Sequence, residues 1–445
     1  MHKSLVWAEF GRGAGNCATN GVRMSVGVRA GYKHTEVGVI PEDWEVFPIS
    51  GLAEIRGGIA KNENVVLSDA VSVHYLRVAN VQDGYLNLSD MSKIQLNRKD
   101  LARYSVLPGD MLMNEGGDLD KLGRGAIWLG ELNPCVHQNH VFVVRCKQSL
   151  LPGFLSIWTS TSAARRFFLL VGKQTTNLAS ISKSSLSALP VATPPLPEQR
   201  AIATALSDVD ALLSGLDNLI AKKQNLKQAS MQQLLTGQTR LPGFSGEWEV
   251  KRIGDEIDLL TGFPFPSDGY ATSGIRLLRG SNVKRGTTDW SEDISQYWPA
   301  INAELSRYEL REGDLVIAMD GSLVGRSYAQ LKHDDLPALL LQRVARIRST
   351  KKLDVSYLAA FIGSDWFVKY ADSVKTVTAI PHISPTNIHN FSIPIPPTIA
   401  EQTAIATVLS DMDTELAALQ ARLGKTRALK QGMMQELLTG RIRLI

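Results

Sequence analysis

This chain of 445 residues has few cysteines, a small net charge and no long apolar run. Its three cysteines, Cys17, Cys135 and Cys146, are too few for a disulfide scaffold and are typical of a reducing compartment. No run of 18 apolar residues occurs, which excludes a conventional membrane-spanning helix. The formal net charge is only +4, so charge alone indicates no nucleic-acid partner. Together with the length, these shortages predict a cytoplasmic protein of two or more domains, without a membrane partner.

One long block of sequence is present twice. Glu198 and Gln199 correspond to Glu401 and Gln402, a constant offset of 203 residues, and the same offset relates 231–237 to 434–440. The segments before these blocks match more weakly, with an offset that varies between 202 and 204 residues. The pattern predicts a duplication of one globular domain followed by one helix. Two units of domain size exclude a solenoid.

Both repeated blocks have the apolar spacing of a coiled coil, with intervals of 4, 3, 4, 3 and 4. The positions are Ile202, Leu206, Val209, Leu213, Leu216 and Ile220 in the first block, and Ile405, Leu409, Met412, Leu416, Leu419 and Leu423 in the second. We predict that the two helices pair antiparallel and relate the two domains by a pseudo-twofold repeat. The alternative is two surface helices, each packed on its own domain.

The apolar seam turns polar toward the end of each helix. Lys223 and Lys227 occupy it in the first block, and Thr426 and Lys430 occupy it in the second. Two interpretations stay open. The polar positions either limit the length of the pairing or form a surface for another protein.

The globular segments have strands first and helices later. Short alternating stretches such as 73–81 and 141–144 precede helical patterns near 155–170 and 355–370, which is typical of an α+β domain. The predicted organisation is an N-terminal extension outside the fold (1–31), a first domain (32–196), a central helical spacer region (197–240), a second domain (241–399) and a C-terminal helical spacer region (400–445). Met24 is a natural start, so residues 1–23 are expected to be an upstream extension.

The motifs of catalysis and of cofactor binding are missing. Residues 424–426 read GKT, like the end of a P-loop, but Leu419 stands where that loop needs a glycine. The adenine-methyltransferase tetrapeptide is absent. Cys135, His137, His140 and Cys146 resemble a zinc site only superficially, because the second copy has Arg343 opposite His140 and no cysteines. We therefore expect no catalytic residues, no cofactor and no metal in this chain.

Several short strings resemble one family. Residues 32–44 read YKHTEVGVIPEDW, residues 197–199 read PEQ, the strings LLTG occur at 234–237 and 437–440, and GFPF occurs at 262–265. Together with the duplicated architecture, they resemble the DNA-specificity subunit of type I restriction-modification systems. The resemblance covers the chain from about Tyr32 onward, and residues 1–23 depart from it.

The resemblance implies a non-enzymatic DNA-binding subunit. Its two target-recognition domains would each read one half of a bipartite site in double-stranded DNA, with the helices as spacer. Implied partners are two methylation subunits that bind S-adenosylmethionine and flip adenines, and ATP-dependent restriction subunits. Two other interpretations remain open: a self-contained methyltransferase or nuclease fragment, and an assembly scaffold that reads no sequence.

Candidate DNA contacts follow from side-chain chemistry, because Arg and Asn read guanine and adenine edges while Lys suits phosphates. Polar loops near the ends of both globular segments add further candidates. The predicted set in the first domain is Lys61, Arg77, Asn80, Arg124, Lys173 and Thr175. The predicted set in the second domain is Arg279, Asn282, Lys284, Arg326, Lys375 and Thr376. Because Asn80 and Asn282 recur in both copies, the alternative is that they hold turns common to the fold.

Overall fold

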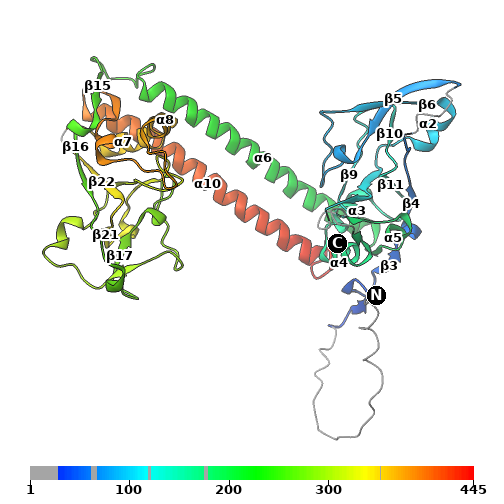
Figure 1. The fold of residues 1–445 in the computed structure, drawn as a ribbon. Helices are drawn as coiled ribbons and strands as arrows, with labels where there is room; N and C mark the ends of the chain where they lie inside the picture. Colours follow the sequence, from blue (N-terminus) through cyan, green and yellow to red (C-terminus); the bar gives the residue numbers. More distant parts are fainter. Residues whose placement is uncertain (1–28, 62–67, 119–121, 175–178, 351, 445) are drawn as a thin grey trace, which may run out of the picture. The chain divides into compact units, whose positions relative to one another are not determined.

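The computed structural model describes residues 29–61, 68–118, 122–174, 179–350 and 352–444. The chain divides into two compact units (Figure 1). Unit 1 comprises Met1–Ala211 and Arg427–Ile445, and unit 2 comprises Leu212–Thr426. Each long helix is thus shared by both units. Within the described residues, no helix is both long and apolar enough to cross a membrane.

Unit 1 is built around a four-stranded antiparallel sheet with the order β4-β11-β7-β9, beside a three-stranded sheet with the order β10-β5-β6. In the second sheet β10 and β5 are parallel. The strands are β4 (Ala53–Arg56), β5 (Ala70–Leu76), β6 (Ser92–Asn97), β7 (Met111–Asn114), β9 (Gly125–Ile127), β10 (Cys135–His137) and β11 (Val141–Cys146).

Unit 2 repeats this topology. Its four-stranded sheet has the order β16-β22-β19-β20 and its three-stranded sheet the order β18-β17-β21, in which β17 and β21 are again parallel. The strands are β16 (Ile257–Thr261), β17 (Ile275–Leu278), β18 (Tyr297–Trp298), β19 (Leu315–Ala318), β20 (Tyr328–Gln330), β21 (Ala338–Leu340) and β22 (Val344–Ser349). The matching topology confirms the predicted duplication and the α+β class.

Smaller strand pairs complete both units. The pair β3 (Glu45–Pro48) with β14 (Pro190–Thr193) corresponds to β15 (Glu249–Arg252) with β23 (Ser392–Ile395). Unit 1 also has a hairpin of β1 (Tyr32–Thr35) and β2 (Gly38–Pro41), and a small sheet of β8 (Gly116–Gly117), β12 (Lys173–Gln174) and β13 (Ala179–Ser180).

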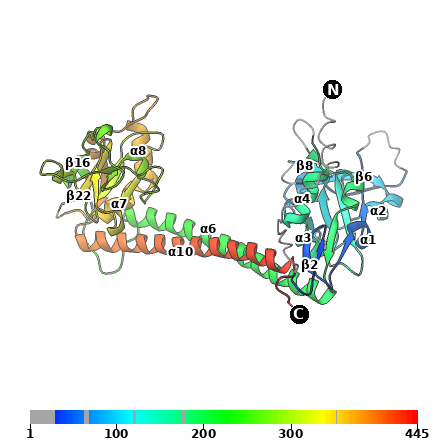
Figure 2. The same ribbon diagram turned by 90° about the horizontal axis from the view of Figure 1, so that it is seen from below.

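The larger helices of each unit come after the strands of its four-stranded sheet and pack against that sheet. In unit 2, α7 packs against β19, β20 and β22, and Figure 2 shows α7 close to β22. In unit 1, α3 packs against β9. The short helices are α1 (Ile49–Leu52), α2 (Arg98–Tyr104), α3 (Pro152–Trp158), α4 (Ser162–Val171) and α5 (Lys183–Ser187) in unit 1, and α7 (Val355–Ile362), α8 (Asp365–Val374) and α9 (Pro385–His389) in unit 2.

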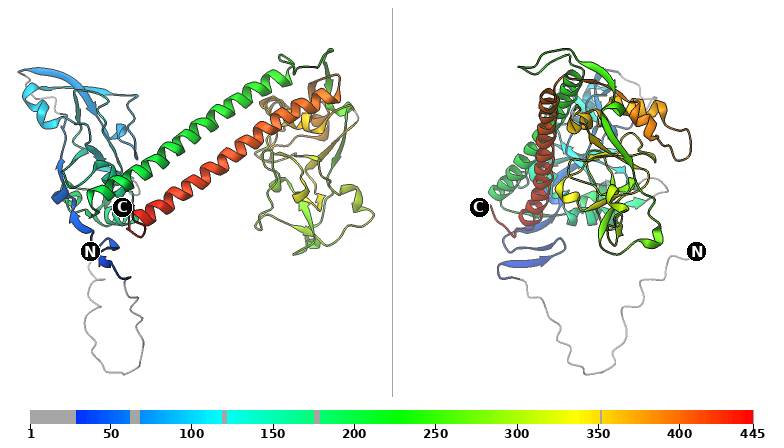
Figure 3. Two further views of the ribbon diagram at one scale, coloured as in Figure 1. Left: turned by 180° about the vertical axis from the view of Figure 1, so that it is seen from behind. Right: turned by 90° about the vertical axis from the view of Figure 1, so that its left-hand side faces the viewer.

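The two long helices are α6 (Leu196–Leu235) and α10 (Ile399–Leu437). Within unit 2 their apolar seam buries Leu216 and Ile220 against Leu416 and Leu423, and α6 and α10 run side by side in both views of Figure 3. The periodicity of the sequence explains this contact, because intervals of 3 and 4 keep one apolar stripe on the partner helix.

Ion pairs across the helices establish that they run antiparallel. In unit 2, Lys223 pairs with Glu415 and Lys227 with Asp413, so the numbering rises on one helix as it falls on the other. In unit 1, Lys430 pairs with Asp210. Where the seam is polar, ion pairs therefore continue the contact between α6 and α10. The predicted antiparallel arrangement is confirmed.

In each unit, an ion pair joins the start of one long helix to the chain segment that follows the other long helix. In unit 1, Arg443 donates to Glu198 near the start of α6 and to Asp43. In unit 2, Arg240 donates to Glu401 near the start of α10. The two glutamates are buried, at 0% exposure, and the two arginines lie 203 residues apart. The duplication therefore extends to these buried ion pairs.

Candidate nucleic-acid interface

Asn80 and Asn282 stabilise turns inside the two domains. Asn80 is 3% exposed and Asn282 0%. The side-chain oxygen of Asn80 accepts from the backbone N–H of Arg77, and its amide donates to the carbonyls of Asn87 and Asp90. Asn282 makes the matching bonds, from the Arg279 N–H and to the Asp289 carbonyl. Their amides are occupied within the fold, so the structure favours the turn-holding role over base contact.

Arg77 and Arg279 also form hydrogen bonds with the segments that follow these turns. The Arg77 guanidinium donates to the carboxylate and carbonyl of Asp90, at 2.8 and 2.9 Å, and that of Arg279 donates to the Ile294 carbonyl at 2.8 Å. Both side chains are partly exposed. They can reach a phosphate only at the cost of these internal bonds.

A cluster of charged side chains lies on unit 2 around Asp372. Arg326 donates to this carboxylate at 2.9 Å and Lys375 at 2.6 Å. These hydrogen bonds, that of Arg326 foremost, lower the pKa of Asp372. The carboxylate holds both cations at the surface, where they are half-exposed. The fold thus brings together Arg326 and Lys375, two predicted DNA contacts from distant parts of the sequence.

The loop that contains Lys284 lies beside the strand that follows Arg326. The backbone of Tyr328 in β20 donates to the Lys284 carbonyl at 2.9 Å and accepts from Gly286 at 2.8 Å. Lys284 and Arg285 are exposed, and Lys284 lies 3.5 Å from Asp289. Sequence reasoning missed Arg285, which its position next to Lys284 could have suggested.

The remaining candidates are more scattered. Lys61 and Lys173 are exposed, and Arg124 forms an ion pair with Asp83 at 3.4 Å. In unit 2, Thr376 bonds through its hydroxyl to His382 Nδ1 at 2.9 Å, which fixes the loop after α8. Thr175 lies outside the described residues.

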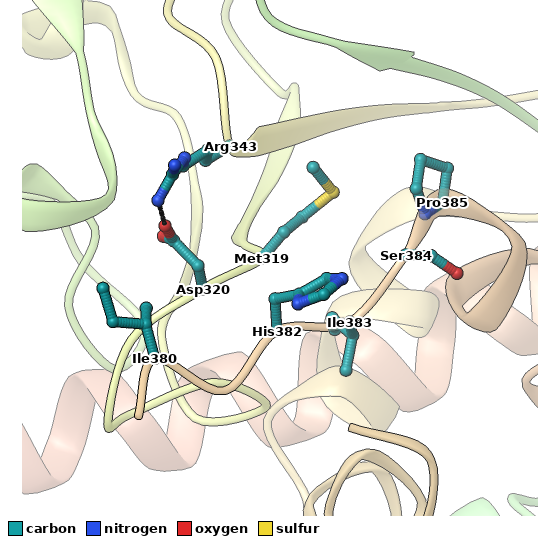
Figure 4. Close-up of a pocket in the computed structure, with 8 residues that line it drawn as sticks. All are labelled: Met319, Asp320, Arg343, Ile380, His382, Ile383, Ser384 and Pro385. Carbon is teal, nitrogen blue, oxygen red and sulfur yellow. Dashed lines mark hydrogen bonds and ion pairs between the residues drawn. The ribbon is translucent and has the colours of Figure 1, made fainter. Parts of the chain in front are cut away.

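Sequence reasoning also missed Arg343, which lies at the edge of a hollow of about 480 Å³. Figure 4 shows its guanidinium pointing to the carboxylate of Asp320, with Met319 and His382 beside them. The two charged groups are 2.8 Å apart, and the Arg343 side chain is 64% exposed. One signal for it was in the sequence, because the duplication aligns this cation with His140.

In the first domain, the surroundings of His137, Cys135 and Cys146 are typical of side chains with a structural role. Buried His137 forms a hydrogen bond through Nδ1 to the Val141 carbonyl at 2.7 Å, and burial lowers its pKa. Burial also raises the pKa of Cys135 and of Cys146 to about 12. In the described parts of the chain, no group of three or more His, Cys, Asp or Glu side chains could hold a metal ion.

A model of one known protein family matches two successive segments of the chain. The model of the type I restriction modification DNA specificity domain matches residues 41–228 and 245–425, which together are well over half of the chain. Each match begins within a globular domain and extends into the long helix that follows it. The two matches thus follow the internal duplication.

Individual relatives match over nearly their whole length. The type I restriction enzyme MjaVIII specificity subunit of Methanocaldococcus jannaschii is 24% identical, over 91% of this chain and 94% of its own. The type I restriction enzyme EcoKI specificity subunit of Escherichia coli K12 is 24% identical, over 90% and 89%. The crystal structure of the type I restriction-modification system S subunit from M. genitalium has a similar fold, with a TM-score of 0.56 at 13% identity, covering 88% of this chain and 96% of that one.

Proposed function

This chain belongs to the family of the type I restriction-modification DNA specificity domain, and from that premise we propose that it is the sequence-reading subunit of such a system. The observation that carries the proposal is the twofold match at 41–228 and 245–425, on two domains of the same topology. Each domain reads one half of a bipartite site in double-stranded DNA. The half-sites differ because the loop residues of the two domains differ.

The recognition domains extend over residues 32–196 and 241–399, followed by helical spacer regions at 197–240 and 400–445. Antiparallel pairing of α6 and α10 supports a spacer of fixed length, because the ion pairs of Lys227 with Asp413 and of Lys430 with Asp210 hold the helices in register. The spacer sets the gap between half-sites and docks two methylation subunits. Those subunits bind S-adenosylmethionine and supply the chemistry, restriction subunits supply ATP-dependent cleavage, and the complex works in the cytoplasm.

Exposed or partly exposed cations on both domains are the proposed phosphate contacts. They are Lys61 and Lys173 on the first domain and Lys284, Arg326 and Lys375 on the second. Arg77 and Arg124 add to the cations of the first domain and Arg279 to those of the second, and the hydroxyls of Thr175 and Thr376 are further proposed contacts. Phosphate contacts position a protein on DNA without reading bases. A local cationic surface of this kind is compatible with the small net charge of +4.

The test is a methylation map. The full chain is co-expressed with the methylation subunit encoded beside it, and N6-methyladenine is located across a host genome. We expect one motif of two short parts separated by a fixed gap. Methylation without a shared motif would identify the chain as a scaffold that reads no sequence. S-adenosylmethionine binding by the purified chain alone, measured by calorimetry, would instead favour a self-contained methyltransferase.

A further inference from the structure

Arg343 and His140 occupy the same place in the two domains. The Arg343 carbonyl accepts from the N–H of Met319 at 2.9 Å, and the His140 carbonyl accepts from the N–H of Glu115, also at 2.9 Å. Met319 in turn accepts from Ile383, and Glu115 from Ile181, each at 2.8 Å. The backbone framework is therefore shared, while the side chain that it presents differs between the domains.

A carboxylate orients the cation or imidazole in each domain. Asp320 accepts from Arg343 Nη1 at 2.8 Å. In the first domain Glu115, one position earlier in the framework, lies 2.7 Å from His140 Nδ1. Both basic side chains remain largely exposed, His140 at 56% and Arg343 at 64%. Each is thus held in one orientation but remains accessible to a large ligand.

Arg343 also has an unusual backbone. Its φ of 68° is the only positive value at a non-glycine position among the described residues. This left-handed region is unfavourable for a residue with a β-carbon, and such outliers cluster at functional sites. Glycine would fit here without strain. No buried contact of the Arg343 side chain compensates for this backbone strain, because the side chain is exposed.

The guanidinium has donors left for a ligand. Asp320 takes Nη1, and among the described residues Nε and Nη2 of Arg343 have no hydrogen-bond partner. These two N–H groups form one edge of the planar fork, which matches the O6 and N7 acceptors of guanine. The hollow beside it, bordered by Met319, Ile380 and His382, leaves room for a base edge to approach (Figure 4).

We propose that Arg343 and His140 are the specificity-determining residues at equivalent positions of the two domains, with Arg343 reading a guanine in one half-site. The proposal rests on the proposed function. His140 reads a different base because its chemistry differs. With Nδ1–H donating to Glu115, Nε2 accepts from the Asn139 amide at 3.2 Å. A base is therefore read there only when its exocyclic amino group displaces that amide.

Three variants test this in the complete methylation complex. Arg343→Gly removes the fork and relieves the backbone, so we expect an unfolding temperature no lower than that of the unmodified protein. Arg343→Gln substitutes a side chain that pairs with adenine N6 and N7. His140→Gly is the corresponding variant in the other domain, where the backbone has no positive φ to relieve. Methylation rates are measured on duplexes that carry the mapped motif with each base varied in turn.

We expect Arg343→Gly to lower the preference for one guanine by roughly 5- to 150-fold, the discrimination of one bidentate contact. Arg343→Gln should shift the preference at that position toward adenine. His140→Gly should relax one base in the other half-site only. An unchanged motif, or a uniform fall in rate on all duplexes, would overturn the proposal while leaving the proposed function intact. Absence of any bipartite motif for the unmodified chain would instead contradict the proposed function.

Discussion

At the scale of single residues, the duplication provides an internal comparison for His137. This side chain is 1% exposed and lies opposite Leu76 on β5. At the equivalent place in unit 2, Leu340 lies opposite Leu278 on β17. One copy thus fills the position with an apolar side chain and the other with a neutral imidazole that forms a hydrogen bond with the Val141 carbonyl. The position itself requires burial rather than ionisation.

The buried imidazole makes the first domain sensitive to acid. Burial lowers the pKa of His137, so below pH ~6.5, the ordinary histidine value, the unfolded chain binds a proton that the folded chain resists. Stability of unit 1 should therefore fall as pH decreases through that value. His137→Leu should reduce this slope, although loss of the hydrogen bond costs about 1 kcal/mol at pH 8.

The measurement is urea unfolding of the full chain at pH 5, 6, 7 and 8, followed by a probe in unit 1. His34→Gln is the control, because His34 is exposed on β1 and its replacement should leave the slope unchanged. An equal slope in His137→Leu and in the unmodified protein would show that other groups dominate the acid response.

The candidate contacts show where residue-level prediction from sequence reaches its limit. Sequence identity between copies located Asn80 and Asn282, but it could not separate a base contact from a turn, because both need an amide at a defined position. Burial at 3% and 0% makes that distinction. Arg343 was overlooked for the opposite reason. It differs from its counterpart His140, so the alignment of the copies gave the correspondence without a shared residue type, and the shared backbone hydrogen bonds confirm that the two positions are equivalent.

At the scale of elements, the long helices were predictable because heptad spacing is a local property of the sequence. The antiparallel register was not, since the seam alone permits several alignments. Ion pairs select one alignment. Lys227 with Asp413 and Lys430 with Asp210 are equivalent pairs under the offset of 203 residues, and each lies within its own unit.

These pairs predict a measurable coupling. Lys227→Asp places two like charges together and should destabilise unit 2 by about 0.3–1 kcal/mol, since both side chains are partly exposed. The double variant Lys227→Asp, Asp413→Lys should recover most of that loss. Urea unfolding of both single variants and the double variant completes the cycle. The same exchange of Lys430 and Asp210 repeats the test in unit 1, and additive effects in both cycles would mean that the register depends on the apolar seam alone.

At the scale of the whole molecule, the fold class followed from the order of strands and helices, and the duplication from a constant offset. The closing contacts of each unit did not follow, because they join residues that are remote in the chain. Arg443 reaches Glu198, and its counterpart Arg240 reaches Glu401. No pattern within one segment indicates such a partner. The duplication could have indicated the pairing only once one of the two contacts was known.

The spacer role predicts that helix length controls the gap between half-sites. An insertion in α6 alone would move Lys227 out of register with Asp413, so matched insertions in both helices are the sharper experiment. Seven residues after Lys222 and seven after Ala417, positions that face each other in the observed register, preserve the heptad phase. They lengthen the helices by about 10.5 Å, or roughly three base pairs of DNA.

Methylation mapping of this variant should return the same two half-sites with a gap about three base pairs longer. The two half-sites should keep their bases because the recognition loops are untouched. A fourteen-residue insert after Gly243, in the exposed turn between α6 and β15, serves as the control, because it adds the same amount of chain without extending either helix. A constant gap in the helix variant, or altered bases in either half-site, would mean that contacts other than helix length set the spacing.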